Sequence, residues 1–441
     1  MRHVVVMTAT ASLGLLAIFL VDFFSLLYVS WLGDPLLTAA VGYASLINFF
    51  AMSINIGMMI PIGALVSRAL GAGDRDKARQ MSTSGLLIAC IAALFVSGAA
   101  VLLRGDLLRL IGAEGAPLAV ASNYLLIVLP SNILMALGMG FSGVLRAVGD
   151  ARRGMMVTLA GGLVTALTDP LFIFGFGFGV YGAAIATVIS RIIFVIVGYH
   201  GAERVHRMLA PPTLAGLRAD ATPFLAVALP AILTNIATPV GGAYALRVYS
   251  RFGADAVAAN AIIDRVVPLV FCVIFALTGA VGPILGQNLG ARLYPRVRQT
   301  LTDSFTVTLG YCLCVWLLLW RLSGAINFIF HATPETARYV TFFCTWGIVA
   351  WLFLGLLYVA NAAFNNLGFP LLSTAFNWGR ATLGTIPFVT WGAGRGGVEG
   401  AQLGFAAGAA LFSVAAVAAA YFVVRRLAMR GQVAYETQSA K

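Results

Sequence analysis

Three acidic residues lie inside long apolar runs of the sequence, where a charge is costly. They are Asp22 in AIFLVDFFSLLY, Asp169 in LVTALTDPLFIF and Asp264 in AANAIIDRVVPLV. An ionisable residue at the centre of a bilayer costs roughly 2.5–3.5 kcal/mol on insertion scales, so each is a functional candidate. Asp22 has no Lys or Arg near it in sequence, and burial without a partner disfavours the ionised form. The pattern predicts a carboxyl group that binds and releases protons; the alternative is an aspartate that only hydrogen-bonds a neighbouring helix.

The surroundings of Asp169 add polar groups at helical spacing. Thr165 precedes it by four residues, which places both side chains on one helix face. Pro170 follows Asp169 and leaves the carbonyl of Ala166 without its helical donor. Asn48, an amide in another apolar run, either joins this cluster or serves as a packing contact.

Basic residues in apolar runs bear on what the protein binds. Arg247 and Arg380 lie within or at the edge of such runs, and an arginine there usually faces a cavity or a carboxylate. With little acid nearby, they favour an anionic or lipid-like ligand; the alternative is that they extend to the membrane interface. Asp264 precedes Arg265, but adjacent helix positions do not face each other. Asp264 is therefore either a structural ion-pair member or part of a cavity.

Large adaptable side chains crowd the first two apolar runs. They include Phe23, Phe24, Tyr28 and Met52. Flexible and aromatic side chains of this kind form walls that accept varied apolar ligands. Lipid contact and core packing are the alternative role for most of them.

The composition identifies the medium in which these residues sit. Of the 441 residues, 60% are hydrophobic and 10% charged, whereas a soluble domain carries about 25% charged residues. Apolar runs long enough to cross a bilayer recur along the chain. The predicted spans are 8–31, 37–66, 82–103, 118–142, 155–175, 179–200, 224–249, 256–286, 301–322, 336–361, 370–391 and 398–424. We expect an all-α polytopic membrane protein of twelve helices, the first of them retained and not cleaved as a signal peptide.

Several function classes are disfavoured by the motifs. The five cysteines show no metal-ligand spacing and are expected to be small buried hydrophobes. The glycine run GFGFGVYG joins two predicted spans, so it lacks the strand–helix context of a nucleotide site, and no P-loop is present. We expect neither an enzyme nor a metal site, and no cofactor apart from a coupling ion.

The distribution of Lys and Arg predicts the orientation. With both termini in the cytoplasm, loops and tails on that side hold eighteen of these residues and the opposite loops hold six. Positive loops are translocated poorly, so this bias supports that orientation. The net charge of +12 then reflects topology and anionic lipid headgroups, not a nucleic-acid partner.

The two halves of the chain resemble each other. ALVSRALGAGDRDKARQ from Ala64 corresponds to PILGQNLGARLYPRVRQ from Pro283, an offset of 219 residues, and VLRAVGD corresponds to AFNNLGF at the same offset. We therefore predict two six-helix lobes, 1–210 and 211–441, related by an axis along the membrane normal. Transporters built from such repeats place a central cavity at the repeat interface and rock one half against the other.

These motifs also carry a family resemblance. LVSRALGAGDRDKA, then LRAVGDARR and TDPLFIFGFGFGVYGAAIATVISR, and GQNLGA in the second half resemble the multidrug and toxic compound extrusion (MATE) family over almost the full length. The resemblance implies a proton- and cation-responsive site in the first half, made of Asp22, Thr165, Asp169 and Thr187. Thr165 departs from the family, which usually has asparagine there. For Thr187, a hydroxyl bonded to its own helix is the alternative.

The resemblance implies a secondary antiporter that exports amphipathic organic compounds in exchange for protons by alternating access. Spans seven and ten to twelve hold no acid before Glu399, which favours the DinF-type branch over the sodium-coupled NorM type. The alternatives are a flippase for a lipid-linked or anionic amphipathic substrate and a sodium-coupled multidrug antiporter. We expect a monomer, surrounded by lipid, in a bacterial or archaeal plasma membrane.

Overall fold

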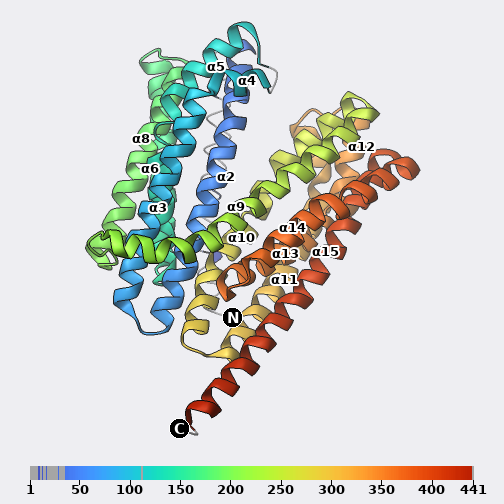
Figure 1. Cartoon of the computed structure of the whole chain (residues 1–441). Helices are drawn as coiled ribbons and strands as arrows, with labels where there is room; N and C mark the ends of the chain where they lie inside the picture. The colour runs from blue at the N-terminus through green and yellow to red at the C-terminus, as the bar shows by residue number, and fades with distance from the viewer. Residues whose placement is uncertain are drawn as a thin grey trace. The chain divides into compact units, whose positions relative to one another are not determined.

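The computed structural model describes residues 35–439 except 111 and 112, together with residues 8, 9, 12, 16 and 28. Asp22 and Phe23, two of the candidate residues, and Phe24 lie outside this part. The described chain is helical, with no strand among the described residues, and it divides into two compact units, Ala9–Ile232 and Leu233–Lys441. The helices are labelled in Figure 1.

From Pro35 onward, the first unit has two long helices joined by a tight turn. Its elements are α2 (Pro35–Gly71), α3 (Arg75–Leu102), α4 (Arg104–Leu110), α5 (Gly115–Val128), α6 (Asn132–Ala147), α7 (Ala151–Pro170), the π-helical turn η1 (Leu171–Gly175), α8 (Val180–Tyr199) and the π-helical turn η2 (His200–Val205). Ile62, Phe141 and Val144 lie in its core, and Phe224 from α9 packs against them.

The second unit contains α9 (Leu214–Tyr249) from Leu233 onward, and the helices that follow it. Its other elements are η3 (Ser250–Phe252), α10 (Ala254–Gly290), α11 (Tyr294–Ile329), α12 (Pro334–Phe342), η4 (Phe343–Gly347), α13 (Val349–Leu367), α14 (Pro370–Gly379), η5 (Arg380–Gly384) and α15 (Ile386–Ser439). The ring of Phe271 and the free thiols of Cys312 and Cys344 are buried in its core. Cys314, in contrast, is exposed.

The predicted spans from 37 to 424 each overlap a described helix or helix pair. In the described part, nine helices are long and apolar enough to cross a membrane, or ten when the pair α5 and α6, bent by 49°, counts as one span. Pro130 lies at this bend and cannot donate a helical hydrogen bond. One of the nine, Pro370–Met429, covers the two predicted spans 370–391 and 398–424, because Gly396 and Gly397 break the helical backbone of α15 between them. The predicted first span, 8–31, lies mostly outside the described residues.

The segment before the kink at Gly396 and Gly397 and the segment after it form two arms, which approach each other at glycines. A Cβ at Gly400, Gly404 or Gly408 would overlap a main-chain carbonyl oxygen of the opposite arm, at Gly392, Phe388 and Gly384 respectively. Small residues at every fourth position let membrane helices pack backbone against backbone. This stripe therefore holds spans eleven and twelve together as a hairpin.

The predicted lobe boundary at 210 falls in the connection between η2 and α9. The two units meet further along, between Ile232 and Leu233 inside α9. The reason lies in the first three turns of α9, which are tied to the first unit: Lys77 forms an ion pair with Asp220 at 2.7 Å, and Gln80 donates to the same carboxylate at 3.0 Å.

Candidate functional site

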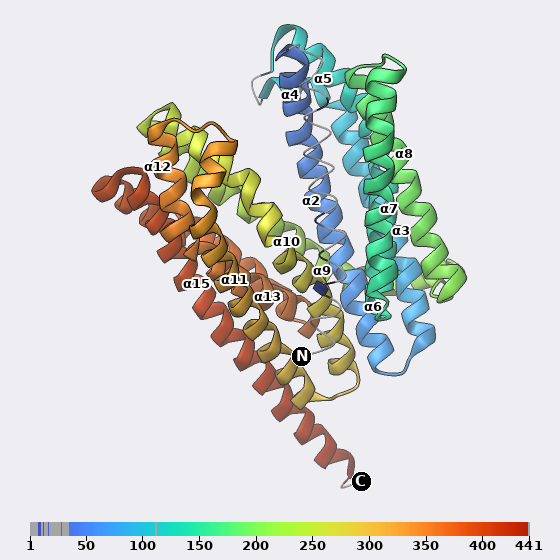
Figure 2. The same cartoon turned by 180° about the vertical axis from the view of Figure 1, so that it is seen from behind.

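Helices α7 and α8 run antiparallel and set the level of the predicted coupling residues (Figure 2). Their register is fixed where the Ser190 hydroxyl donates to the carbonyl of Gly161 at 2.9 Å. This register puts Thr165 level with Thr187, about one turn further from Ser190. The sequence alone could not give this alignment, because the loop between the two helices leaves it open.

Asp169 lies one turn beyond Thr165, at the end of α7. Its side chain is 1% exposed. Pro170 follows it, and the π-helical turn η1 begins at Leu171. Proline has no backbone N–H, and the missing hydrogen bond permits such a widened turn. Turns of this kind inside helices frequently mark functional sites. A buried carboxyl group is thus held where a candidate membrane helix widens into a π-helical turn.

The two threonine hydroxyls bond to their own helices. Thr165 donates to Gly161 at 3.1 Å, and Thr187 donates to Ala183 at 2.9 Å. The second contact is the local alternative that the sequence left open. Each hydroxyl oxygen keeps lone pairs that can accept a further hydrogen bond.

Asn48 on α2 is bound by a buried arginine that sequence reasoning missed. Arg191 on α8 is 6% exposed. Its guanidinium donates to Asn48 at 3.1 Å, to the Ser131 hydroxyl at 2.9 Å and to the carbonyl of Val128 at 3.0 Å. Arg191 thus connects α2, α8 and the bend between α5 and α6. The signal was present: it is a charged residue in the middle of the predicted span 179–200.

A second buried amide pair lies on α2 and α6. Asn55 donates to Asn132 at 2.7 Å, and both side chains are at most 2% exposed. The amide nitrogen of Asn132 has no hydrogen-bond partner within the described part of the chain. Arg191 and this pair thus make two separate buried polar contacts with α2, at Asn48 and at Asn55.

The predicted apolar wall is only partly brought together. Tyr28 meets the ring of Phe174 edge to face, with centroids 6.2 Å apart, and packs on the cluster around Ile173 and Val180. Met52 is 37% exposed on α2, and Phe49 and Phe50 are about half exposed. Tyr28 therefore has a packing role in this conformation, whereas the exposed residues of α2 lie free at the surface of their unit.

The candidate residues of the second unit occupy three different environments. Arg247 is exposed in the last turn of α9, as expected for a side chain that extends to the interface. Asp264 is exposed and accepts a hydrogen bond from Asn260 at 2.8 Å. It does not pair with Arg265 among the described residues, because adjacent side chains of a helix point apart. Arg380 in η5 is 1% exposed.

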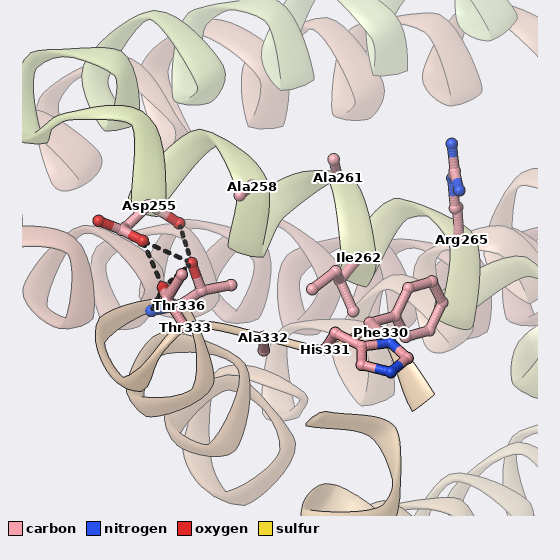
Figure 3. Close-up of a pocket in the computed structure, with 10 residues that line it drawn as sticks. All are labelled: Asp255, Ala258, Ala261, Ile262, Arg265, Phe330, His331, Ala332, Thr333 and Thr336. Carbon is pink, nitrogen blue, oxygen red and sulfur yellow. Dashed lines mark hydrogen bonds between the residues drawn. The ribbon is translucent and has the colours of Figure 1, made fainter. Parts of the chain in front are cut away.

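A cavity of about 390 Å³ lies at one end of the second unit, between the start of α10 and the connection from α11 to α12 (Figure 3). Its acidic residue, Asp255, accepts hydrogen bonds from Thr333 and from Thr336 at 2.5 and 2.9 Å. Thr333 is the N-cap of α12 and also accepts from the N–H of Thr336. Asp255 therefore stabilises a helix start through its Oδ1 atom, which accepts both of these hydrogen bonds.

The family comparison agrees with the repeated architecture. The MatE family profile matches residues 11–171 and again residues 230–391. The two matched segments begin 219 residues apart, the offset at which the sequence motifs repeat. The chain belongs to the MATE family. It is a membrane transporter built from two repeats, and it is not an enzyme.

Two relatives of this MATE protein are named for different transported compounds. It is 25% identical over 383 residues to the FAD transporter of Shewanella oneidensis, which covers 85% of this chain and 84% of that protein. It is 27% identical over 264 residues to the multidrug export protein MepA of Staphylococcus aureus, which covers 58% of this chain and 57% of MepA. Both relatives are transporters by name.

Solved structures share the fold. The MATE transporter VcmN of Vibrio cholerae in the bent form matches with a TM-score of 0.92 over 97% of this chain and 98% of that one, at 24% identity. A transporter from Pyrococcus furiosus, reported with a reversed polarity of its binding pocket, matches with a TM-score of 0.88 at 19% identity and 96% coverage of both chains. The predicted all-α architecture of two six-helix repeats is confirmed.

Charged contacts join neighbouring segments at the end of the first unit that is predicted to face the cytoplasm. Asp150 caps α7 by accepting from the N–H of Arg153 at 3.0 Å. The same carboxylate contacts the side chains of Arg153 and His206, which ties η2 to the start of α7. Partial burial opposes ionisation of Asp150, but these three hydrogen bonds outweigh it, so the pKa of the carboxyl lies below its usual value.

Replacing Asp150 by Asn tests this contact. Asparagine keeps the cap but removes the charge, so we expect a loss of about 0.5–1 kcal/mol of stability. A lowered folded-state pKa contributes stability that is complete above the unfolded value of about 3.9 and is lost as pH falls through the folded value. Thermal unfolding in detergent, followed from pH 7 down to pH 3, should therefore fall less steeply for the variant. Parallel curves would contradict this account.

Replacing Arg191 by Lys tests the buried clamp. Nη1 of Arg191 reaches Ser131 and Val128 at the α5–α6 bend while Nη2 reaches Asn48 on α2, and a single ammonium nitrogen lacks this fork. Each hydrogen bond to a charged donor contributes about 1.5–3 kcal/mol. With two of the three lost, we expect a destabilisation of about 3 kcal/mol, visible as a lower unfolding temperature in detergent. Arg109→Lys, at an exposed position in α4, is the matched control. An unchanged unfolding temperature for the Arg191 variant would show that the clamp is not needed for stability.

Proposed function

We propose that this protein is a secondary antiporter that exports amphipathic organic compounds in exchange for protons. The observation that carries the proposal is Asp169, a carboxyl group 1% exposed where α7 passes into the π-helical turn η1. Burial favours the neutral form of a carboxyl group, and a change in its surroundings can then release the proton. The named function of MepA, multidrug export, supports the substrate class.

Alternating access connects this proton to the substrate. Protonation of Asp169, and of Asp22 as the sequence predicts, would change how the first helix packs and so alter the binding of the substrate. Proton is the proposed coupling ion, and no other cofactor is invoked. Sodium is the competing ion, since carboxylate, amide and hydroxyl oxygens from Asp169, Asn48 and Thr187 are ligands that it accepts. We place the protein in the plasma membrane as a monomer, with both termini in the cytoplasm.

The deciding experiment uses purified protein in proteoliposomes loaded with a fluorescent cationic dye, ethidium. A proton gradient is imposed without sodium, and a sodium gradient is imposed at constant pH in a parallel sample. Dye movement that follows the proton gradient and stops with a protonophore is the expected result. Movement that follows only sodium would refute proton coupling and leave the transporter assignment intact.

A second candidate function is export or flipping of an anionic amphipathic compound. It is favoured by the relative named as an FAD transporter, which aligns over 85% of this chain. FAD is an anion with two phosphate groups, unlike ethidium. The same proteoliposomes, tested with FAD in place of the dye, separate the two candidates.

A further inference from the structure

Arg380 is the most completely buried charged side chain of the second unit. It opens the π-helical turn η5, which joins α14 to α15, and it is 1% exposed. Its guanidinium makes one long hydrogen bond, from Nη2 to the Thr238 hydroxyl of α9 at 3.4 Å. Its Nε is buried and has no hydrogen-bond partner among the described residues. Most of the donor capacity of this side chain is therefore unused.

The groups around Arg380 are neutral. The hydroxyl of Tyr358 on α13 bonds to Thr238 and lies near the guanidinium. Asn377 donates to Asn361 at 2.9 Å one turn away. The ion pairs described in this unit involve Arg338 with Glu335 and Glu399, not Arg380. The guanidinium thus lacks a carboxylate partner within the described part of the unit.

A guanidinium stays protonated in proteins, so burial does not remove its charge. A buried charge without a counter-charge is strongly unfavourable, and an arginine at bilayer depth usually faces a cavity or a carboxylate. Arg191 in the first unit shows the contrast: it is equally enclosed, yet three acceptors satisfy it. The unused N–H donors and the positive charge of Arg380 are therefore suited to bind an anion.

The backbone around Arg380 is held in shape. The Thr385 hydroxyl donates to the carbonyl of Arg380 at 2.9 Å, across the π-helical turn. The Trp378 indole donates to the carbonyl of Leu233 on α9 at 3.1 Å. These contacts fix the backbone position of Arg380 and leave the N–H donors of its guanidinium unused. A planar donor fork on a fixed base is the arrangement that recognises phosphate and carboxylate groups.

We propose that Arg380 binds the negatively charged group of the transported compound, and that the substrates of this protein include organic anions that carry phosphate or carboxylate groups. The proposal rests on the proposed export function and names a substrate class for it. Arg380 is covered in the described conformation, so the anion reaches it in another state of the transport cycle. The relative named as an FAD transporter handles a compound of this class.

The test compares FAD with riboflavin, which has the same ring system but no phosphate. Thermal unfolding of the full-length protein in detergent is measured with each flavin, and separately with inorganic phosphate and chloride. The variants are Arg380→Gln and Arg380→Lys. Arg321→Gln, at an exposed position in α11, is the control. FAD uptake into proteoliposomes is measured alongside ethidium transport.

FAD should raise the unfolding temperature of the wild type and of Arg321→Gln by at least about 2 °C at saturation, and riboflavin should not. Arg380→Gln should lose this shift and at least about tenfold in FAD transport, as expected for one charged hydrogen bond, while Arg380→Lys keeps part of both. Without ligand, Arg380→Gln should unfold at the wild-type temperature or above it, because an uncompensated charge is gone. A lower temperature would instead indicate a structural role.

Other results overturn the proposal. Equal FAD shifts in wild type and Arg380→Gln, or no FAD shift in either, would show that Arg380 does not bind the anion. A full shift with chloride or inorganic phosphate alone would assign the site to an inorganic ion. Failure of the export function is separate: it would appear as no gradient-driven movement of ethidium or FAD, while the unfolding measurements would still decide the role of Arg380.

Discussion

Replacing Asp169 by Asn is expected to reduce proton-driven efflux to the leak rate of protein-free liposomes. Asparagine has nearly the same size and can hydrogen-bond in the same place, but it cannot bind and release a proton. Since Asp169 is 1% exposed at the end of α7, the substitution removes a titrating group without opening the packing. Efflux of ethidium under an imposed proton gradient measures the effect.

A control variant and a binding measurement test whether the effect is specific to Asp169. Asp106→Asn changes an exposed acid in α4 of the same unit and should leave efflux unchanged. Binding of ethidium to the Asp169 variant, measured by fluorescence polarisation, should persist, because the substitution removes coupling and not the substrate cavity. Asp22→Asn is expected to behave like Asp169→Asn on sequence grounds. If the Asp169 variant still transports in response to the proton gradient, this carboxyl group is not the coupling site.

The second large effect is expected from Gly404→Val. Its Cβ would overlap the main-chain carbonyl of Phe388 in the opposite arm, and a backbone cannot move aside as a flexible side chain can. Overpacking costs about 1–3 kcal/mol where side chains can adjust, and more where they cannot. We expect the variant to give little monodisperse protein by size-exclusion chromatography, with a sharply lower unfolding temperature in whatever fraction survives.

Gly394→Val is the matched control for the hairpin. It makes the same chemical change in α15, but nothing lies within 4 Å of the added Cβ. Because the two variants share any change in helix propensity and hydrophobicity, the difference between them isolates the contact between the arms. Similar yields and unfolding temperatures for both would show that the glycine stripe does not hold the hairpin together.

Hydropathy alone predicted the helices well, because a bilayer requires each span to be long and continuous. The helix α2 and the pair α5 and α6 lie where the apolar runs indicated. The π-helical turns were not predicted. η1 follows Pro170, a visible signal, but η5 contains no proline, and its widened backbone depends on tertiary packing that no local pattern encodes.

The site was predicted less completely than the fold. The burial of Asp169 agrees with its apolar surroundings in the sequence, whereas for Arg380 the sequence left a cavity position and extension to the interface both open. The bonding of Thr187 to its own helix remained open, because it depends on which acceptors neighbouring helices present. Arg191 was missed although it met the same criterion as the acids. Its three partners come from α2 and from the α5–α6 bend, up to 143 positions away in the chain, and only the folded unit reveals them.

The position of the unit boundary has a mechanical consequence. The two units join between Ile232 and Leu233, within one unbroken helix, α9. Two bodies joined by a loose strand can turn freely, whereas a helix resists bending and transmits torque along its axis. Pro230, two residues before the joint, supplies no N–H to the helical ladder and is a local weak point in that rod. Flexure of α9 near Pro230 therefore costs elastic energy, so this helix resists bending at the boundary between the two units.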